Sequence, residues 1–396
     1  MSDIPDNLVR RTPFPASVSR GVVTPLQPSV VYASPDPDTL DSQYEGGAQG
    51  FTYSREGHPN ASVLAQKIDA LEGVTGGWIT GSGMAAVSAA MLGLLSQGDH
   101  VIGGDQLYGR SLRMLAQDLP RFGITATLVD PTDAQAVEAA ITPATKLILV
   151  EVVSNPTLRV ADMEGIACIA KKHGLILVVD NTFTTPRAYQ PFLHGADVVI
   201  NSVTKLLAGH SDAMLGYVAA KDPDHASQIE VASVTFGLTP SPYDCWMAER
   251  GLMSFHLRYD RAEENAAALA DHLSSLSGIK RVIYPGRADH PDHDRAGVLL
   301  GSRFGNMVSF ELEGGRESAN ALTRAMPEMA FAPTLGDIGT TLSHAASSSH
   351  RGLTPEEREA LGMTEGFFRV SVGVEDIELL TAEFSRGLAA VEKSVQ

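Results

Sequence analysis

The chain has 396 residues, of which 43% are hydrophobic and 19% charged, a composition typical of a folded α/β protein. Its formal net charge of -17 leaves no basic footprint, which excludes general nucleic-acid binding. No uncharged apolar run approaches the roughly 18 residues of a membrane helix, and no apolar leader precedes the first charged residues. Because Cys168 and Cys245 stand in no metal-binding or redox spacing, we expect a cytoplasmic protein with reduced thiols.

The pattern of apolar residues divides the chain into three parts. Residues 1–60 are rich in Pro, Ser, Gly and Asp and predict an extended arm that finds its order against another surface. Residues 61–250 predict an α/β domain, because apolar runs of strand length alternate with stretches of helical spacing. The predicted strands are 76–80, 100–104, 125–130, 146–153, 175–181 and 197–201, and the predicted helices are 62–73, 84–95, 134–141 and 164–174. Such strands form a mostly parallel sheet covered by helices on both faces.

Residues 251–396 differ in character and predict a smaller α+β domain at the carboxyl end. A long helix is expected at 258–276, followed by strands at 282–286, 307–313 and 368–373 with helices between them. With 396 residues the chain is long enough to bury a core in each of the two domains.

Two polar residues follow neighbouring apolar strands of the larger domain. Asp180 ends the most apolar strand, and ligands of open parallel sheets bind at such strand ends. A carboxylate there needs a cationic partner, for which a ligand nitrogen is one candidate and a turn or helix-capping role the alternative. Lys205 follows the next strand, where burial lowers the pKa of the amine and permits Schiff-base chemistry. A structural lysine is the alternative, but together with Asp180 and the hydroxyls of Ser202 and Thr204 a cofactor site is favoured.

A glycine-rich turn precedes the predicted helix 84–95. Gly81, Ser82 and Gly83 allow close approach of the backbone to an anion, and the free N–H groups of a helix start favour a phosphate. The same letters fit the dinucleotide fingerprint, with Asp105 at about the expected distance. An NAD-binding oxidoreductase therefore remains an alternative, although it leaves Lys205 and Asp180 without a role.

Four motifs together resemble the Cys/Met-metabolism group of fold-type I enzymes that use pyridoxal 5'-phosphate (PLP). They are GSGMAA, ILVVDNTFTTP, INSVTKLLAGHSD and FRVSVGVED, and the resemblance runs from about Val22 to Gly387. Members include cystathionine γ-synthase, cystathionine β- and γ-lyases and methionine γ-lyase. The resemblance implies PLP as cofactor, a small amino acid as substrate, and a homotetramer built from dimers that share active sites.

The resemblance also implies roles for individual residues. Lys205 would carry the cofactor as a Schiff base and, with Tyr108, act as acid and base. The cofactor contacts implied are Asp180 at the pyridine nitrogen, Tyr108 on the ring, Asn155 near the ring hydroxyl, and Gly83, Met84, Ser202 and Thr204 at the phosphate. Tyr53 and Arg55 would reach the phosphate of the neighbouring subunit. The substrate contacts implied are Arg369 at the α-carboxylate, with Asn155, Thr340 and Arg113 around it.

The chain departs from the family pattern in the segment TLGDIGTTLSHAA. Gly339 stands where many members have a glutamate, and Ala345 where they have a proline, so one wall of the substrate site loses a side chain. Arg110 and Arg113 are candidates for a distal substrate group or simple surface residues. His290 and His293 indicate a solvated helix entrance and not a metal site.

We therefore expect a carbon–sulfur lyase that eliminates the γ-substituent of cystathionine, methionine or a similar amino acid. The alternatives within the family are β-elimination and γ-replacement, and a catalytically silent relative that serves as a binding module is a further alternative.

Overall fold

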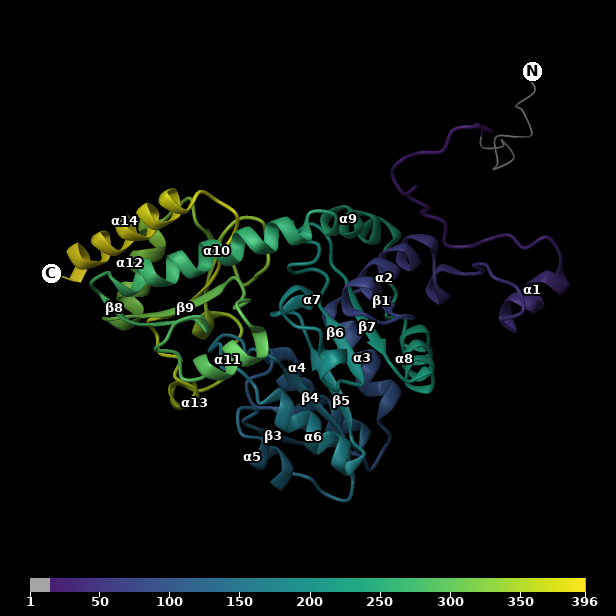
Figure 1. The fold of residues 1–396 in the computed structure, drawn as a ribbon, viewed down its shortest axis with the longest axis horizontal. Coiled ribbons are helices and arrows are strands. Elements are labelled where there is room, and N and C mark those ends of the chain that lie inside the picture. The colour runs from purple at the N-terminus through teal and green to yellow at the C-terminus, as the bar shows by residue number, and fades with distance from the viewer. Residues whose placement is uncertain (1–14, 396) are drawn as a thin grey trace.

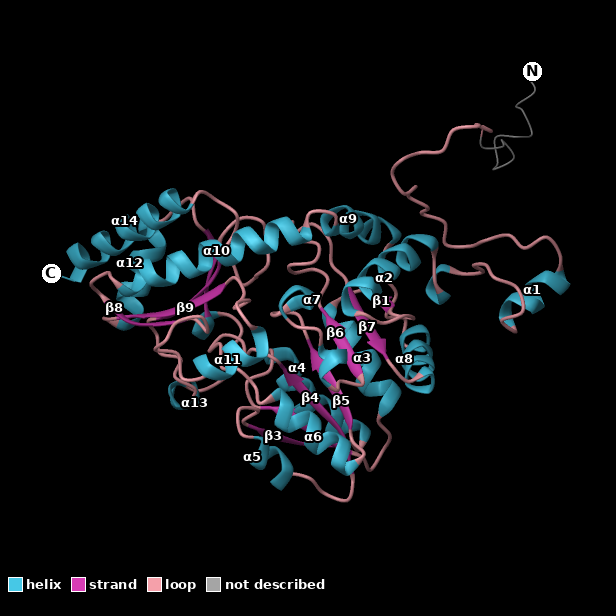
Figure 2. Ribbon diagram, viewed as in Figure 1, coloured by secondary structure: helices cyan, strands magenta, loops and turns pink. Residues whose placement is uncertain are grey.

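The computed structural model describes residues 15–395 and contains two separate β-sheets, each with its own helices (Figures 1 and 2). The first 14 residues of the predicted arm and Gln396 lie outside the described residues. None of the described helices has both the length and the apolar character that a bilayer crossing requires.

The larger sheet has seven strands in the order β1-β7-β6-β5-β4-β2-β3. Its strands are β1 (Trp78–Thr80), β2 (His100–Gly104), β3 (Thr125–Val129), β4 (Thr145–Glu151), β5 (Ile176–Asp180), β6 (Val198–Asn201) and β7 (Gly216–Ala220). Among these strands only β7 runs against its neighbours, which confirms the predicted, mostly parallel sheet. The order differs from the 3-2-1-4-5-6 order of the Rossmann fold, so the dinucleotide alternative loses its structural basis.

Helices cover both faces of this sheet, as the near-continuous apolar strands require. One face packs on α3 (Gly83–Leu94) and α8 (Pro223–Thr235), and the other on α2 (Pro59–Glu72) and α6 (Met163–His173) (Figure 1). In β5, Val178 belongs to the core beneath α3, whereas Val179 belongs to the core beneath α2. Because side chains alternate along a strand, this pattern decides which face each residue at a strand end addresses.

The smaller sheet has five strands in the order β10-β11-β12-β9-β8. They are β8 (Ile279–Ile283), β9 (Met307–Leu312), β10 (Ala330–Phe331), β11 (Thr341–His344) and β12 (Phe367–Ser371), and all the pairs except β10 with β11 are antiparallel. Three helices pack against it, α10 (Phe255–Ser274), α12 (Gly315–Ala325) and α14 (Ile377–Val395) (Figure 1). This arrangement confirms the predicted α+β character of the carboxyl-terminal part.

The remaining α-helices are short, and all of them except α1 lie between or beside these layers (Figure 1). They are α1 (Pro37–Tyr44), α4 (Gly109–Arg113), α5 (Ala134–Ala139), α7 (Thr185–Ala188), α9 (Pro242–Leu252), α11 (His293–Leu300) and α13 (Pro355–Ala360). The described part of the arm carries α1 away from both sheets (Figure 1). Its nearest anchor is the stretch 24–27, where the carbonyl of Thr24 accepts from Trp246 Nε1 at 2.8 Å and that of Pro25 from Asn60.

Candidate active site

The ends of β5 and β6 bring together the acidic residue and the lysine that the sequence singles out. Asp180 Oδ1 accepts from the backbone N–H of Thr182 at 3.0 Å and from its hydroxyl at 2.6 Å. The Thr182 hydroxyl oxygen in turn accepts the N–H of Ser202 at 2.8 Å, which ties the two strand ends together. Burial raises the pKa of Asp180, and the hydrogen bonds from Thr182 oppose that shift. Within the described residues, no group hydrogen-bonds to Oδ2, so this oxygen is available to a ligand.

Lys205 lies in the turn after β6, with its amine directed at the second sheet. Nζ donates to the Thr334 hydroxyl at 3.4 Å, a long contact that leaves the amine free to move. Burial lowers the pKa of Lys205, and the charge of Arg369 lowers it further. A larger fraction of this amine is therefore unprotonated near neutral pH than of a surface lysine.

Arg369 comes from β12 of the smaller sheet and reaches the same place. Nη1 donates to Asn155 Oδ1 at 2.6 Å, and Nη2 donates to the carbonyl of Thr334 at 2.7 Å. Its third donor atom, Nε, is buried and has no partner among the described residues. Burial lowers the pKa of Arg369 to about 10, and the phenol of Tyr108 acts in the opposite direction. Arg369 is thus a buried cation that retains N–H groups for a ligand, including the unpaired Nε.

The start of α3 forms a cradle beside Ser202. Ser82 caps the helix by accepting the N–H of Ala85 at 3.1 Å, while the N–H groups of Gly83 and Met84 have no partner within residues 15–395. A side chain at Gly83 would place Cβ 2.7 Å from the Cβ of Ser202, so only glycine permits this approach. Two backbone donors and the unbonded hydroxyl of Ser202 therefore surround one small space.

The hydroxyl of Thr204, which the resemblance also assigns to the phosphate, has other partners here. It donates to the carbonyl of Leu215 at 3.1 Å and accepts the N–H of Leu215 at 2.9 Å. Its single proton would have to leave the Leu215 carbonyl before it could serve an anion.

Tyr108 stands at the start of α4, immediately before Gly109. Its phenol is 40% exposed and forms no hydrogen bond with the described residues, so it is free to meet a ligand. Its backbone, in contrast, is held firmly, because the N–H donates to Glu151 Oε1 at 2.7 Å. Glu151 ends β4, in register with Asp180 on the adjacent strand.

Four other residues to which the family resemblance assigns a role lie apart from this cluster, or their polar groups already form contacts within the chain. Tyr53 is exposed, and Arg55 stacks on it and donates to the carbonyl of Val234. Arg113 lies on the surface in a 3.7 Å contact with Asp118. The Thr340 hydroxyl donates to Glu375 Oε2 at 2.8 Å and accepts from Gly373.

The position of Gly339 is not empty of acidic groups, because the side chains of Asp337 and Glu375 lie beside it. A Cβ at this position would lie 3.3 Å from Asp337 Oδ1 and 3.7 Å from Glu375 Oε1. Asp337 also accepts the Gly339 N–H at 2.8 Å. The segment belongs to the site, because Gly336 packs against the backbone of Lys205 and Leu206.

Three residues of this region, Thr182, Thr334 and Glu151, were not predicted as site residues. Thr182 stands within the motif ILVVDNTFTTP without a charge that would single it out, and Thr334 lies far from the other motifs along the chain. Glu151 could have been found from the sequence, since an acidic residue within the run LILVEVV is costly to bury without a partner.

His290 and His293 were predicted at a solvated helix entrance, but His290 is only 6% exposed, and its Nδ1 accepts the N–H of Asp292 at 3.1 Å. Asp292 binds the Nε of Arg159 at 2.6 Å and also accepts the N–H of Val160. Within the described residues, no group of three His, Cys, Asp or Glu side chains could hold a metal ion.

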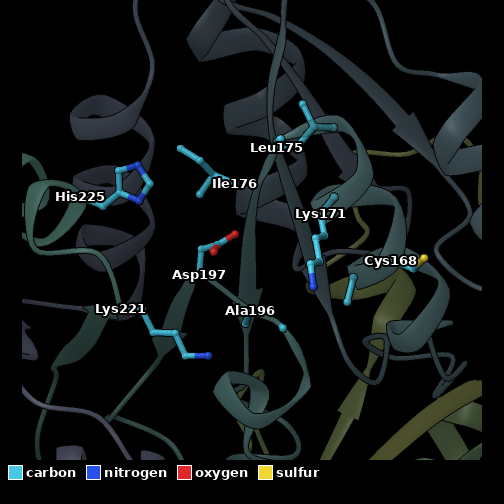
Figure 3. Close-up of a pocket in the computed structure, with 12 residues that line it drawn as sticks. Cys168, Lys171, Leu175, Ile176, Ala196, Asp197, Lys221 and His225 are labelled. Atoms are coloured by element: carbon cyan, nitrogen blue, oxygen red, sulfur yellow. The ribbon is translucent and has the colours of Figure 1, made fainter.

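A cavity of about 690 Å³ lies at the opposite end of the sheet (Figure 3). Leu175 and Ile176 line it where β5 begins, and Asp197 lines it just before β6. Asp180 and Lys205 stand at the other ends of these strands. The cavity is therefore separate from the cluster around Lys205.

Comparison with known proteins identifies the family. The sequence matches the family described as Cys/Met metabolism PLP-dependent enzyme over residues 8–389. It is 40% identical over 341 residues to cystathionine beta-lyase MetC of Bacillus subtilis, with 86% of this chain and 87% of the relative covered. It is 36% identical over 343 residues to cystathionine gamma-lyase of the same organism, with 87% and 90% covered.

A solved structure that contains the PLP–lysine group has the same fold as this chain. The putative O-acetylhomoserine (thiol)-lyase of Campylobacter jejuni, which contains N'-pyridoxyl-lysine-5'-monophosphate, superposes with a TM-score of 0.90 at 28% identity, covering 95% of this chain and 97% of the other. The family, the fold and the cofactor expected from the sequence motifs are thereby confirmed. The chain belongs to the Cys/Met metabolism family of PLP-dependent enzymes.

Proposed function

We propose that the enzyme cleaves the bond between Cγ and sulfur in an L-amino acid of the cystathionine or methionine type. The products would be a thiol, an α-keto acid and ammonia. The observation that carries the first step of this proposal, deprotonation at the α-carbon, is the shared contact at Thr334, whose hydroxyl meets the amine of Lys205 and whose carbonyl meets the guanidinium of Arg369. A mobile base and a carboxylate-binding cation side by side suit deprotonation at the α-carbon of an amino acid.

The residues around this point fit PLP. Asp180 Oδ2 is free to pair with the pyridine nitrogen, while the N–H groups of Gly83 and Met84 with the Ser202 hydroxyl supply donors for the phosphate. The cradle accepts a phosphate only because Gly83 lacks a side chain. When bound, PLP delocalises the electron pair that remains after a proton leaves the α-carbon.

Each protein group has one task in the proposed reaction. Arg369 binds the substrate α-carboxylate through Nε, with Asn155 holding the guanidinium from behind. Lys205 Nζ takes the proton from Cα, must give that proton up before it can act again, and then takes a second proton from Cβ; its flexible stem and long contact to Thr334 permit this movement. Tyr108 supplies the acid for the departing sulfur, because the residue is 40% exposed and its phenol forms no hydrogen bond with the described residues.

We further propose that the arm (residues 1–60) completes the site of a neighbouring copy within a homotetramer, while 61–250 and 251–396 form the two domains. The described arm exposes Val22, Val23, Val30 and Val31, which a partner surface would bury. Tyr53 and Arg55 would then reach the phosphate of the neighbour.

Dimers assembled from two different inactive variants test whether neighbouring subunits share their active sites. If Arg55→Ala and Lys205→Ala are each inactive, co-expressed subunits should recover activity, because half of the sites in a mixed dimer carry neither change. A mixture that stays inactive, although mixed dimers are isolated, contradicts the proposed arrangement.

A product panel tests the reaction. Cystathionine should yield 2-oxobutanoate and cysteine, and methionine should yield 2-oxobutanoate and methanethiol. Lys205→Ala is the control, since it should lose both turnover and the visible absorption of the bound cofactor. Pyruvate as the only keto acid from cystathionine would refute γ-elimination.

Cystathionine β-lyase is the second candidate, favoured by the 40% identity to the Bacillus subtilis enzyme of that name. It predicts pyruvate and homocysteine in the same panel. Formation of a thioether from an O-acylhomoserine and a thiol, without keto-acid release, would instead indicate γ-replacement.

A further inference from the structure

Glu151 is a buried acid at the end of β4 that none of the steps above uses. It follows directly after the apolar side chains of β4 and is itself only 9% exposed. Oε1 accepts the N–H of Tyr108 at 2.7 Å, across 43 positions of sequence. Oε2 is buried and has no partner among the described residues.

The contact fixes the backbone from which the Tyr108 ring projects. The carbonyl of Tyr108 already accepts from Ser111 at 2.7 Å and from Leu112 at 3.0 Å as α4 begins. Glu151 holds the other side of the same residue, so both backbone polar groups of Tyr108 are engaged. The side chain has no hydrogen bond of its own, and its position therefore depends on the backbone.

Glu151 and Asp180 address the same face of the sheet. The strands are parallel, the two residues are in register, and Leu149 and Val178, two positions earlier, both belong to the core beneath α3. Burial raises the pKa of Glu151 well above its usual value, and the charge of Asp180 raises it further. Burial and the neighbouring charge of Asp180 thus both disfavour ionisation of Glu151, while its Oε1 remains the acceptor for the Tyr108 N–H.

We propose that Glu151 is a positioning residue, which anchors the Tyr108 backbone to the end of β4 and thereby holds the phenol in place for proton transfer. The inference rests on the proposed function in one respect, the acid role of Tyr108. The anchor itself is a property of the fold and can be measured separately.

Four substitutions test the anchor. Glu151→Leu removes the acceptor with little change of volume. Glu151→Gln keeps an acceptor oxygen at the same distance, whereas Glu151→Asp keeps the carboxyl group on a side chain shorter by one methylene. Tyr108→Phe removes the phenol that the anchor serves.

The holoenzyme with the substrate identified by the product panel gives the kinetic readout. Loss of the anchor in Glu151→Leu should lower kcat by about 100-fold with little change in KM, as expected when a reacting group is misplaced. Glu151→Gln should have a kcat only about threefold below that of the wild type, whereas Glu151→Asp should keep most of the loss seen in Glu151→Leu. In the Tyr108→Phe background, Glu151→Leu should have almost no further effect on kcat, because the group that it positions is gone.

Hydrogen exchange of the holoenzyme supplies a readout that is independent of turnover. The peptide that contains the Tyr108 amide should exchange faster in Glu151→Leu than in wild type, and at nearly the wild-type rate in Glu151→Gln. This comparison stands whether the enzyme performs γ-elimination, β-elimination or γ-replacement. Failure of the proposed function would therefore alter the product panel and leave the exchange pattern as expected.

Three results would overturn the inference. The first is a double variant, Glu151→Leu with Tyr108→Phe, whose loss of kcat equals the product of the losses in the two single variants. The second is an active Glu151→Asp beside an inactive Glu151→Gln, and the third is unchanged exchange at Tyr108. If Glu151→Leu does not fold, the Gln and Asp variants still decide the question.

Discussion

Replacement of Arg369 by lysine should weaken substrate binding far more than it slows turnover. The guanidinium serves Asn155 Oδ1 and the Thr334 carbonyl with its two terminal nitrogens and keeps a buried Nε for the substrate carboxylate. A lysine ammonium lacks the planar set of N–H groups of a guanidinium, so it cannot donate to Asn155, to Thr334 and to the substrate in the same geometry. The substrate would lose one to two charge-assisted hydrogen bonds, each worth about 1.5–3 kcal/mol.

A loss of about 3 kcal/mol corresponds to a rise in KM of roughly 100-fold. Because the carboxylate contact is present in both the bound substrate and the transition state, kcat should change little. Steady-state kinetics on the preferred substrate measure both constants. An unchanged KM with a large loss of kcat would refute the assignment of Arg369 as the carboxylate clamp.

Arg369→Gln provides a matched variant that also removes the charge. Burial and Arg369 both lower the pKa of Lys205, so loss of the guanidinium should raise this pKa toward its usual value. Fewer amines are then unprotonated at neutral pH, and the rate at which apoprotein recombines with PLP should fall. The pH profile of that rate should move to higher pH in Arg369→Gln but not in Arg369→Lys, and equal profiles would contradict the electrostatic coupling.

Three further predictions address the cofactor site and its support. Asp180→Asn should keep the hydrogen bonds from Thr182 and retain the cofactor on Lys205 in visible spectra, yet lower kcat on the order of 100-fold or more, because the charge opposite the pyridine nitrogen is lost. Gly83→Ala should push Ser202 away and weaken PLP affinity in a fluorescence titration, at a stability cost of about 1–3 kcal/mol. Gly297→Ala, within α11 and with open space around it, should leave PLP affinity unchanged and stabilise the protein by about 0.5–1 kcal/mol. Burial raises the pKa of Glu72 from 4.5 to about 7, so between these pH values the folded state holds a proton that the unfolded state has lost, and the free energy of unfolding falls as pH rises. In denaturant titrations Glu72→Gln should therefore gain about 3 kcal/mol over wild type between pH 4.5 and pH 8, and parallel pH curves would count against a buried, titrating Glu72.

The sequence predicted the parts of this protein that follow from local pattern. Continuous apolar runs predicted the parallel sheet, and residues at strand ends predicted Asp180 and Lys205 as neighbours, since parallel strands present their carboxyl ends at one edge. Contacts between distant segments could not be read in this way. Thr334 joins Lys205 to Arg369 only because the smaller sheet packs beside the larger one.

Buried carboxyls were the second class of residue that pattern reading missed. Glu151 stands in an apolar run, which signals a costly burial but does not name its partner, and Glu72 stands near the end of an amphipathic helix, where a surface charge is equally expected. Their partners lie on other elements, so only the assembled fold reveals which groups bind them. Sequence motifs thus predict the groups proposed to meet the cofactor, while tertiary contacts reveal the residues that hold those groups in place.

The alternation of side chains at the ends of β5 and β6 explains how these two kinds of residue work together. Asp180 and Ser202 lie on the face beneath α3, where the proposed cofactor contacts are, and Asn181 and Asn201 lie on the opposite face. Glu72 Oε1 accepts from both asparagine amides, at 3.3 Å and 2.7 Å. One buried carboxyl therefore fixes the spacing of two strand ends, and with it the distance between Asp180, the proposed partner of the pyridine nitrogen, and Ser202, the proposed phosphate donor.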